Sequence, residues 1–188
     1  DRLVIVNGPP PGGAERPRPS IFSRAFWRNF YVLPLQLPRL PERTLARNDY
    51  RALAAVFTGR MAGRPEKISP AHLAAFRAAA AEPGALTAMV NYYRALIRGG
   101  GMRRLAAVGF PKIETSTLLI WGDADPILTP DNLADLDRWV AGATVRYLHG
   151  VGHWTQQEAP DEVNEILCAW LANEEVPGAR EPSPAERA

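Results

Sequence analysis

The sequence predicts an α/β protein whose mostly parallel sheet is interrupted by an inserted all-helical cap. A short strand-like run over residues 3–7 opens the chain, and residues 20–110 show helical patterns without a strand. After Pro111 the pattern alternates between strand and helix. Because strand–helix alternation builds parallel sheets, the two ends are expected to form one core, with the helices in between as a lid.

Glycine and proline residues separate the elements expected in the first half of the chain. Gly8 and the prolines behind it end the first strand, so residues 1–19 are expected to form one strand and a loop. Ser20 can cap a first cap helix. The helices expected in the cap are 21–33, 41–57, 70–81 and 85–97, with Ser69 as a cap and Pro70 at the first helical position of the third.

The second half is expected to supply the rest of the core in residues 111–173. Strands are predicted at 116–121 and 144–148, and helices at 130–140 and 159–173. The polar, proline-rich residues 174–188 are predicted to be disordered.

Composition indicates an ordinary globular protein. Twenty-two basic and 20 acidic residues leave a net charge of +2, which gives no ground for a nucleic-acid or membrane partner. No apolar run approaches the length of about 18 residues that a membrane span needs. The single cysteine, Cys168, excludes a disulfide within the chain and is expected to be buried on a helix; a cytoplasmic setting is the default.

An aspartate and a histidine at neighbouring strand ends suggest an acid–base pair. Asp125 follows one predicted strand and His153 follows the next, so both should meet at one edge of a parallel sheet. Asp123 is the nearest rival acid, while His149 and His72 have weaker claims as the base. An aspartate that orients a histidine makes it a better base. Alternatively, the aspartates only stabilise a turn, and His153 is a structural loop residue.

A nucleophile is not evident. The sequence has no Gly-x-Ser-x-Gly, and its serines are explained as caps or loop residues. In hydrolases with the acid before the histidine, the nucleophile precedes both. The chain also begins, at Asp1, almost directly in a strand that lacks a partner. We therefore expect the chain to be the later part of something longer, with the nucleophile in the absent segment.

Three motifs resemble the C-terminal half of α/β-hydrolase-fold epoxide hydrolases: Trp121–Pro126, Gly152–Trp154 and Gln157–Pro160. The opening residues look like the sixth strand of that fold, and residues 20–100 look like its helical cap. The resemblance covers about residues 1–173. The turn after the sixth strand, Gly8-Pro9-Pro10-Pro11, departs from the family's Pro-His-Pro-like pattern.

The resemblance also implies roles for aromatic residues. Tyr31 and Tyr93 occupy the positions of the two cap tyrosines, whose hydroxyls would hydrogen-bond the epoxide oxygen, with Tyr92 as the alternative to Tyr93. Trp154 and Phe30 are expected to line the substrate pocket. The competing interpretation is that these rings only pack within the cap.

By the same resemblance, an aspartate from the absent N-terminal half attacks a small hydrophobic epoxide to form an alkyl-enzyme ester. His153, oriented by Asp125, then activates water to hydrolyse it. No metal or organic cofactor is implied, and the chain alone is expected to be inactive. A dehalogenase or a serine esterase of the same fold, or a non-catalytic truncated remnant, remain the alternatives.

Overall fold

The computed structural model describes residues 1–9, 30–109 and 111–182, which fall into two compact units. The core unit comprises Asp1–Gly13, Arg60–Ile68 and Phe110–Ala188, and the helical unit comprises Ala14–Gly59 and Ser69–Gly109. The main difference between the helical unit and the expected cap of residues 20–110 is the segment 60–68. Residues 60–68 belong to the core unit, because their backbone bonds to the loop that follows β3.

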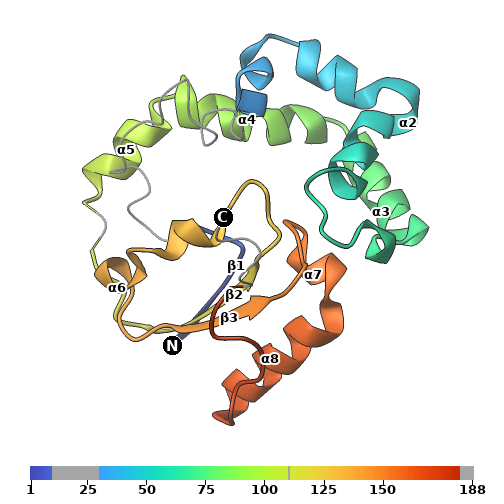
Figure 1. Cartoon of the computed structure of the whole chain (residues 1–188). Helices are drawn as coiled ribbons and strands as arrows, with labels where there is room; N and C mark the ends of the chain where they lie inside the picture. Colours follow the sequence, from blue (N-terminus) through green and yellow to red (C-terminus); the bar gives the residue numbers. More distant parts are fainter. Residues whose placement is uncertain (10–29, 110, 183–188) are drawn as a thin grey trace. The chain divides into compact units, whose positions relative to one another are not determined.

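Three parallel strands form the sheet of the core unit (Figure 1). They are β1 (Arg2–Val6), β2 (Ser116–Gly122) and β3 (Thr144–Leu148), in the order β1-β2-β3. Leu119 of β2 pairs with Ile5 on one side and with Val145 on the other. The central position of β2 explains its unbroken apolar run, because a strand covered on both faces has no polar side.

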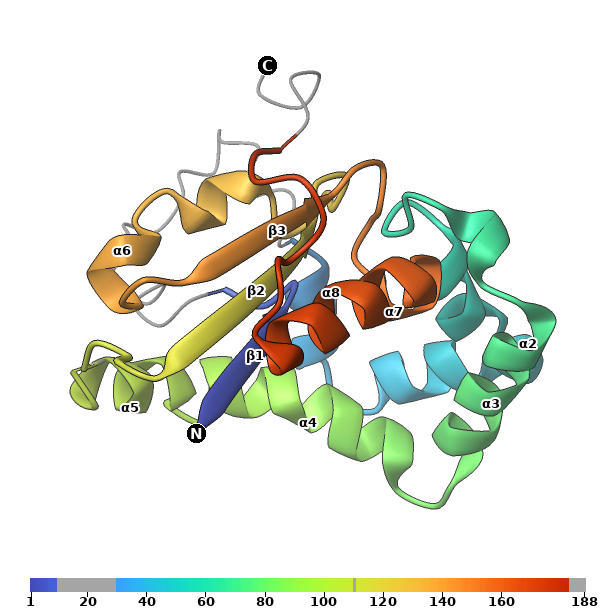
Figure 2. The ribbon, with the colours of Figure 1, turned by 90° about the horizontal axis from the view of Figure 1, so that it is seen from below.

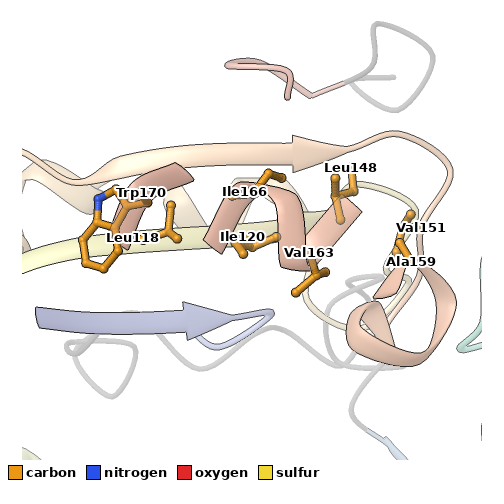
Figure 3. Close-up of a cluster of buried hydrophobic side chains, with 8 residues drawn as sticks. All are labelled: Leu118, Ile120, Leu148, Val151, Ala159, Val163, Ile166 and Trp170. Atoms are coloured by element: carbon orange, nitrogen blue, oxygen red, sulfur yellow. The ribbon is translucent and has the colours of Figure 1, made fainter. Parts of the chain in front are cut away.

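Alternate residues of β2 are buried in two separate clusters, one on each face of the sheet. Leu118 and Ile120 pack against helix α8 (Pro160–Ala172), which crosses one face (Figures 2 and 3). Leu119 and Trp121 pack on the other face against α6 (Leu136–Trp139) and its neighbours. The α8 cluster contains Leu118, Ile120, Leu148, Val151, Ala159, Val163, Ile166 and Trp170.

Three expectations for the core unit were wrong. Instead of one helix over 130–140, the chain forms a 3₁₀ turn at Pro130–Leu133 and the single-turn α6, which bury Leu133, Leu136 and Trp139 separately. Residues 174–182 are not disordered: a backbone bridge joins Ala179 to β3, and a β3 arginine, Arg146, donates to the carbonyl oxygens of Val176 and Pro177. Cys168 is exposed rather than buried.

In residues 30–59 and 69–109, which the structure describes, the helical unit contains two 3₁₀ turns and four α-helices. They are Phe30–Val32, Pro34–Gln36, α2 (Leu40–Thr58), α3 (Pro70–Ala81), α4 (Ala85–Ile97) and α5 (Gly101–Ala107). Most of the helix expected over 21–33, with its Ser20 cap, lies outside the described residues, and its end is a 3₁₀ turn. Helix α2 is broken at residues 47–50, three of which have positive φ, and α5 was not expected.

Apolar packing and ion pairs between helices stabilise the helical unit. Leu53 of α2, Ala80 of α3 and Leu86 of α4 form its buried cluster. Arg94 of α4 binds both carboxylate oxygens of Glu42 in α2, at 2.6 and 3.1 Å. Ser69 caps α3 as predicted, accepting from the backbone N–H of His72. Within the described ranges, no helix has the length and apolar character to cross a membrane.

The α8 cluster predicts where the core is most sensitive to mutation. Ile166 lies on the buried face of α8, and only 2% of it is exposed. The substitution Ile166→Ala should therefore lower the free energy of unfolding by about 2–5 kcal/mol. Glu165→Ala, on the exposed face of the same helix, should change it by less than about 0.5 kcal/mol. Chemical denaturation of both variants measures the difference, and equal effects would contradict this account of the core.

Candidate active site

The carboxyl ends of β2 and β3 bring an aspartate and a histidine into contact. Asp125 follows β2 in the turn after Gly122, and His153 follows β3 in the loop before α7 (Thr155–Glu158). Nδ1 of His153 lies 2.7 Å from Oδ2 of Asp125. The side chain of Asp125 is fully buried, whereas that of His153 is 23% exposed. The ring is therefore bound through Nδ1 and is partly accessible to solvent.

Asp125 is buried but well supplied with hydrogen-bond donors. Its Oδ1 accepts from the backbone N–H groups of Ile127 and Leu128, at 2.8 and 3.0 Å. Burial alone would raise the pKa of Asp125, because it disfavours the charged form. The hydrogen bonds from His153, Leu128 and Ile127 outweigh burial, and the pKa lies below the usual value. An ionised carboxylate only accepts, so Nδ1 of His153 carries the proton of this hydrogen bond.

Asn7 is a third member of this site that the sequence analysis did not identify. It directly follows β1, and its side-chain amide donates to Oδ2 of Asp125 at 2.8 Å and to the carbonyl oxygen of Gly152 at 3.3 Å. Its own amide oxygen accepts from the backbone N–H of Gly122 at 2.7 Å. Asn7 thus joins the ends of all three strands. The sequence feature that could have identified Asn7 as a site residue is its position directly after a strand.

The histidine loop lies directly against residues 61–63. The backbone N–H of His153 donates to the carbonyl oxygen of Met61 at 2.8 Å. A Cβ at Gly152 would come within 2.3 Å of the Gly63 nitrogen, so only glycine permits this approach. Glu158, which the sequence analysis noted only as part of a motif, also bonds to both segments.

A second aspartate–histidine pair lies beside the first. Nδ1 of His149 is 2.6 Å from Oδ2 of Asp123, whose Oδ1 accepts from the backbone N–H of Gly150. The side chain of Asp123 is fully buried, and that of His149 is 54% exposed. Asp123 therefore binds its own histidine rather than His153. His72, the third candidate base, closes the cap of α3 with its ring nitrogen.

The aromatic candidates lie in different parts of the chain. In the helical unit, Tyr31 and Tyr93 contact each other edge to face, with ring centroids 6.0 Å apart. Tyr92 packs edge to face on Tyr93 but is 71% exposed, and Phe30, beside Tyr31, is 41% exposed. In the core unit, Trp154 lies edge to face with His153, with ring centroids 4.9 Å apart.

No metal cluster accompanies these residues. Among residues 1–9, 30–109 and 111–182, no group of three or more histidine, cysteine, aspartate or glutamate side chains is arranged to hold an ion.

The lowered pKa of Asp125 has a consequence for acid stability. A carboxylate whose folded pKa lies below its unfolded value, about 3.9, stabilises the fold above that value. This contribution is lost as the pH falls through the folded pKa. The unfolding free energy of the unmodified protein should therefore exceed that of Asp125→Asn most at neutral pH, and the difference should shrink on acidification. Denaturant titrations across this range measure it.

Asp137→Asn is the matched control, because Asp137 is exposed on α6. The pH dependence measured for Asp125→Asn is compared with that of this variant. A difference for Asp125→Asn that grows as the pH falls would contradict the assigned shift.

The known proteins that the chain resembles are named as hydrolases. It is 33% identical over 177 residues to epoxide hydrolase 3 of Mus musculus, covering 91% of this chain and 45% of the relative. It is 28% identical over 175 residues to an AB hydrolase superfamily protein, YfhM, of Bacillus subtilis, covering 93% of this chain and 58% of the relative. No protein-family profile matches the chain.

Comparison with solved structures also finds epoxide hydrolases. The structure of a variant epoxide hydrolase from Bacillus megaterium superposes with a TM-score of 0.68 at 24% identity, covering 91% of this chain and 60% of that one. At this identity the likeness shows the α/β-hydrolase fold alone. The chain therefore has the α/β-hydrolase fold and is similar in sequence to epoxide hydrolases, and it spans about half the length of the relatives it matches.

Proposed function

We propose that this chain supplies the general base, its orienting acid and two tyrosines to an enzyme that hydrolyses small hydrophobic epoxides to vicinal diols. The contact between His153 and Asp125, 2.7 Å long and backed by a buried carboxylate, carries the proposal. The nucleophilic carboxylate comes from the part of the epoxide hydrolase fold that this sequence does not include.

The reaction has two steps. In the first, the nucleophilic carboxylate attacks an epoxide carbon, the carbon–oxygen bond breaks, and the alkoxide takes a proton. In the second, Nε2 of His153 accepts a proton from water, and the resulting hydroxide attacks the ester carbonyl. The ester bond to the enzyme breaks, and the leaving alkoxide takes the proton from Nε2 to give the diol. The carboxyl group that remains loses its proton, which restores the carboxylate and the tyrosine hydroxyl. Asp125 stabilises the imidazolium that forms and keeps the proton on Nδ1.

The alkoxide proton comes from Tyr31 or Tyr93. The two rings contact each other edge to face in the helical unit. We propose that their hydroxyls act on the same epoxide oxygen. Trp154, in contact with the His153 ring, and Phe30, next to Tyr31 in the sequence, are the proposed substrate-binding residues.

Three other functions fit parts of the same site. A dehalogenase uses the same nucleophile and histidine but needs a halide-binding tryptophan or asparagine, and the paired tyrosines argue against it. A serine esterase needs a Gly-x-Ser-x-Gly motif at the strand-to-helix turn, or elbow, that carries the nucleophile. A truncated remnant needs no such turn. A His-x-Asp-Trp-Gly-like elbow in the reading frame upstream of Asp1 supports the epoxide hydrolase.

Replacement of the base tests the proposal directly. In the full-length protein, His153→Gln should still be alkylated by styrene oxide but should not hydrolyse the ester, so turnover should fall by at least about 10³-fold. Mass spectrometry of the quenched enzyme should detect the trapped ester. His149→Gln removes the histidine of the neighbouring pair and should retain turnover. Undiminished turnover in His153→Gln would refute the assignment of the base.

The tyrosines should affect the other half of the reaction. Tyr31→Phe and Tyr93→Phe should each slow alkylation by styrene oxide about 10- to 100-fold, because an electrophilic hydroxyl is lost while the ring contact stays. Tyr92→Phe, the exposed neighbour, should have little effect. Single-turnover kinetics on the full-length variants measure the alkylation rate. A larger effect in Tyr92→Phe would move the role to that residue.

A further inference from the structure

The carboxylate of Glu158 lies at the centre of the backbone around His153. Glu158 is the last residue of α7 and is fully buried. Its two oxygens accept four backbone hydrogen bonds. Oε2 accepts from Gly63 at 2.9 Å, Arg64 at 2.8 Å and Gly152 at 2.8 Å, and Oε1 accepts from Trp154 at 3.1 Å. A buried charge is costly unless it is bonded in this way, so these donors make the position tolerable.

The four bonds hold His153 from both sides. Gly152 and Trp154 precede and follow it, and each donates its backbone N–H to Glu158. The N–H of His153 itself donates to the Met61 carbonyl oxygen. Three consecutive backbone N–H groups are therefore fixed. The position of the imidazole follows from theirs, because its Cβ is attached to this backbone.

The other two donors belong to the segment Arg60–Ile68, which links α2 to α3. A Cβ at Gly63 would come within 2.5 Å of the Gly150 carbonyl oxygen, so this segment and the histidine loop touch through their backbones. Glu158 closes that contact by bonding to both. A neutral amide could not replace it, because its nitrogen would face N–H donors.

We propose that Glu158 is a positioning residue for the hydrolytic half of the reaction: its carboxylate clamps the His153 loop onto residues 61–64 and so fixes Nε2 at the attacking water. This proposal rests on the proposed function, in which His153 activates that water. Glu158 does not touch the water and acts only through the backbone. Alkylation, which does not use His153, does not depend on the clamp.

This separation gives a kinetic signature that distinguishes positioning from a purely structural role. When only ester hydrolysis slows, kcat and KM fall together and kcat/KM stays constant, because kcat/KM reports binding and alkylation alone. When a variant merely leaves less folded enzyme, apparent kcat and kcat/KM fall together and KM is unchanged. The amplitude of the alkylation burst counts the folded sites in either case.

The test uses Glu158→Gln in the full-length protein with styrene oxide. The rate constant for ester hydrolysis, measured per folded site, should fall about 10- to 100-fold, while the alkylation rate constant should stay within about twofold. Glu162→Gln is the matched control. Glu162, in the following helix α8, binds the side chain of Arg64 at 2.8 Å but does not contact the histidine loop. Its kcat and KM should not change.

Glu158→Asp is the second variant. It keeps the charge but is one methylene too short for all four donors, and it should show the same signature to a smaller degree. If Glu158→Gln gives no burst, Glu158→Asp decides the outcome. Normal ester hydrolysis in the variant that folds, or equal losses in both steps, would overturn the proposal. If His153→Gln traps the ester while the Glu158 variants behave normally, only this inference fails; if His153→Gln traps none, the proposed function fails first.

Discussion

The organisation of the core unit follows from the burial of one carboxylate, that of Asp125. A charge out of contact with water needs donors at every acceptor site, and no single segment supplies them all. Its own turn provides two backbone N–H groups, the end of β1 provides Asn7, and the loop after β3 provides His153. Satisfying this carboxylate therefore ties three strand ends to one point. That point is where the chemistry is proposed.

Parts of the fold were predicted well from the sequence where a residue pattern allows only one structure. The apolar run of β2 has one structural solution, a strand covered on both faces, and both its neighbours pair with it in parallel. The segment 130–140 was ambiguous, because two short turns can bury Leu133, Leu136 and Trp139 as well as one helix can. Likewise, the polar composition of 174–182 did not reveal that Arg146 would bind its carbonyl oxygens.

In the site, contacts between side chains could be predicted from the sequence, whereas contacts to backbone groups could not. Asp125 and His153 act through side chains at strand ends, and the order of elements was enough to bring them together. Asp123 could not be separated from Asp125 by sequence, because both follow β2; each carboxylate proves to have its own histidine. Glu158 was not identified as a contact because its partners are backbone N–H groups, which any residue can offer.

Two buried carboxylates thus act on one histidine by different routes. Asp125 bonds to the ring and fixes its rotation and its tautomer. Glu158 bonds to the backbone on both sides and fixes where the ring is attached. A base held only through its ring could swing with a mobile loop, and a base held only through its backbone could rotate about its side-chain bonds. Both restraints are needed to hold Nε2 in place, and because neither carboxylate is exposed, water does not compete for their hydrogen bonds.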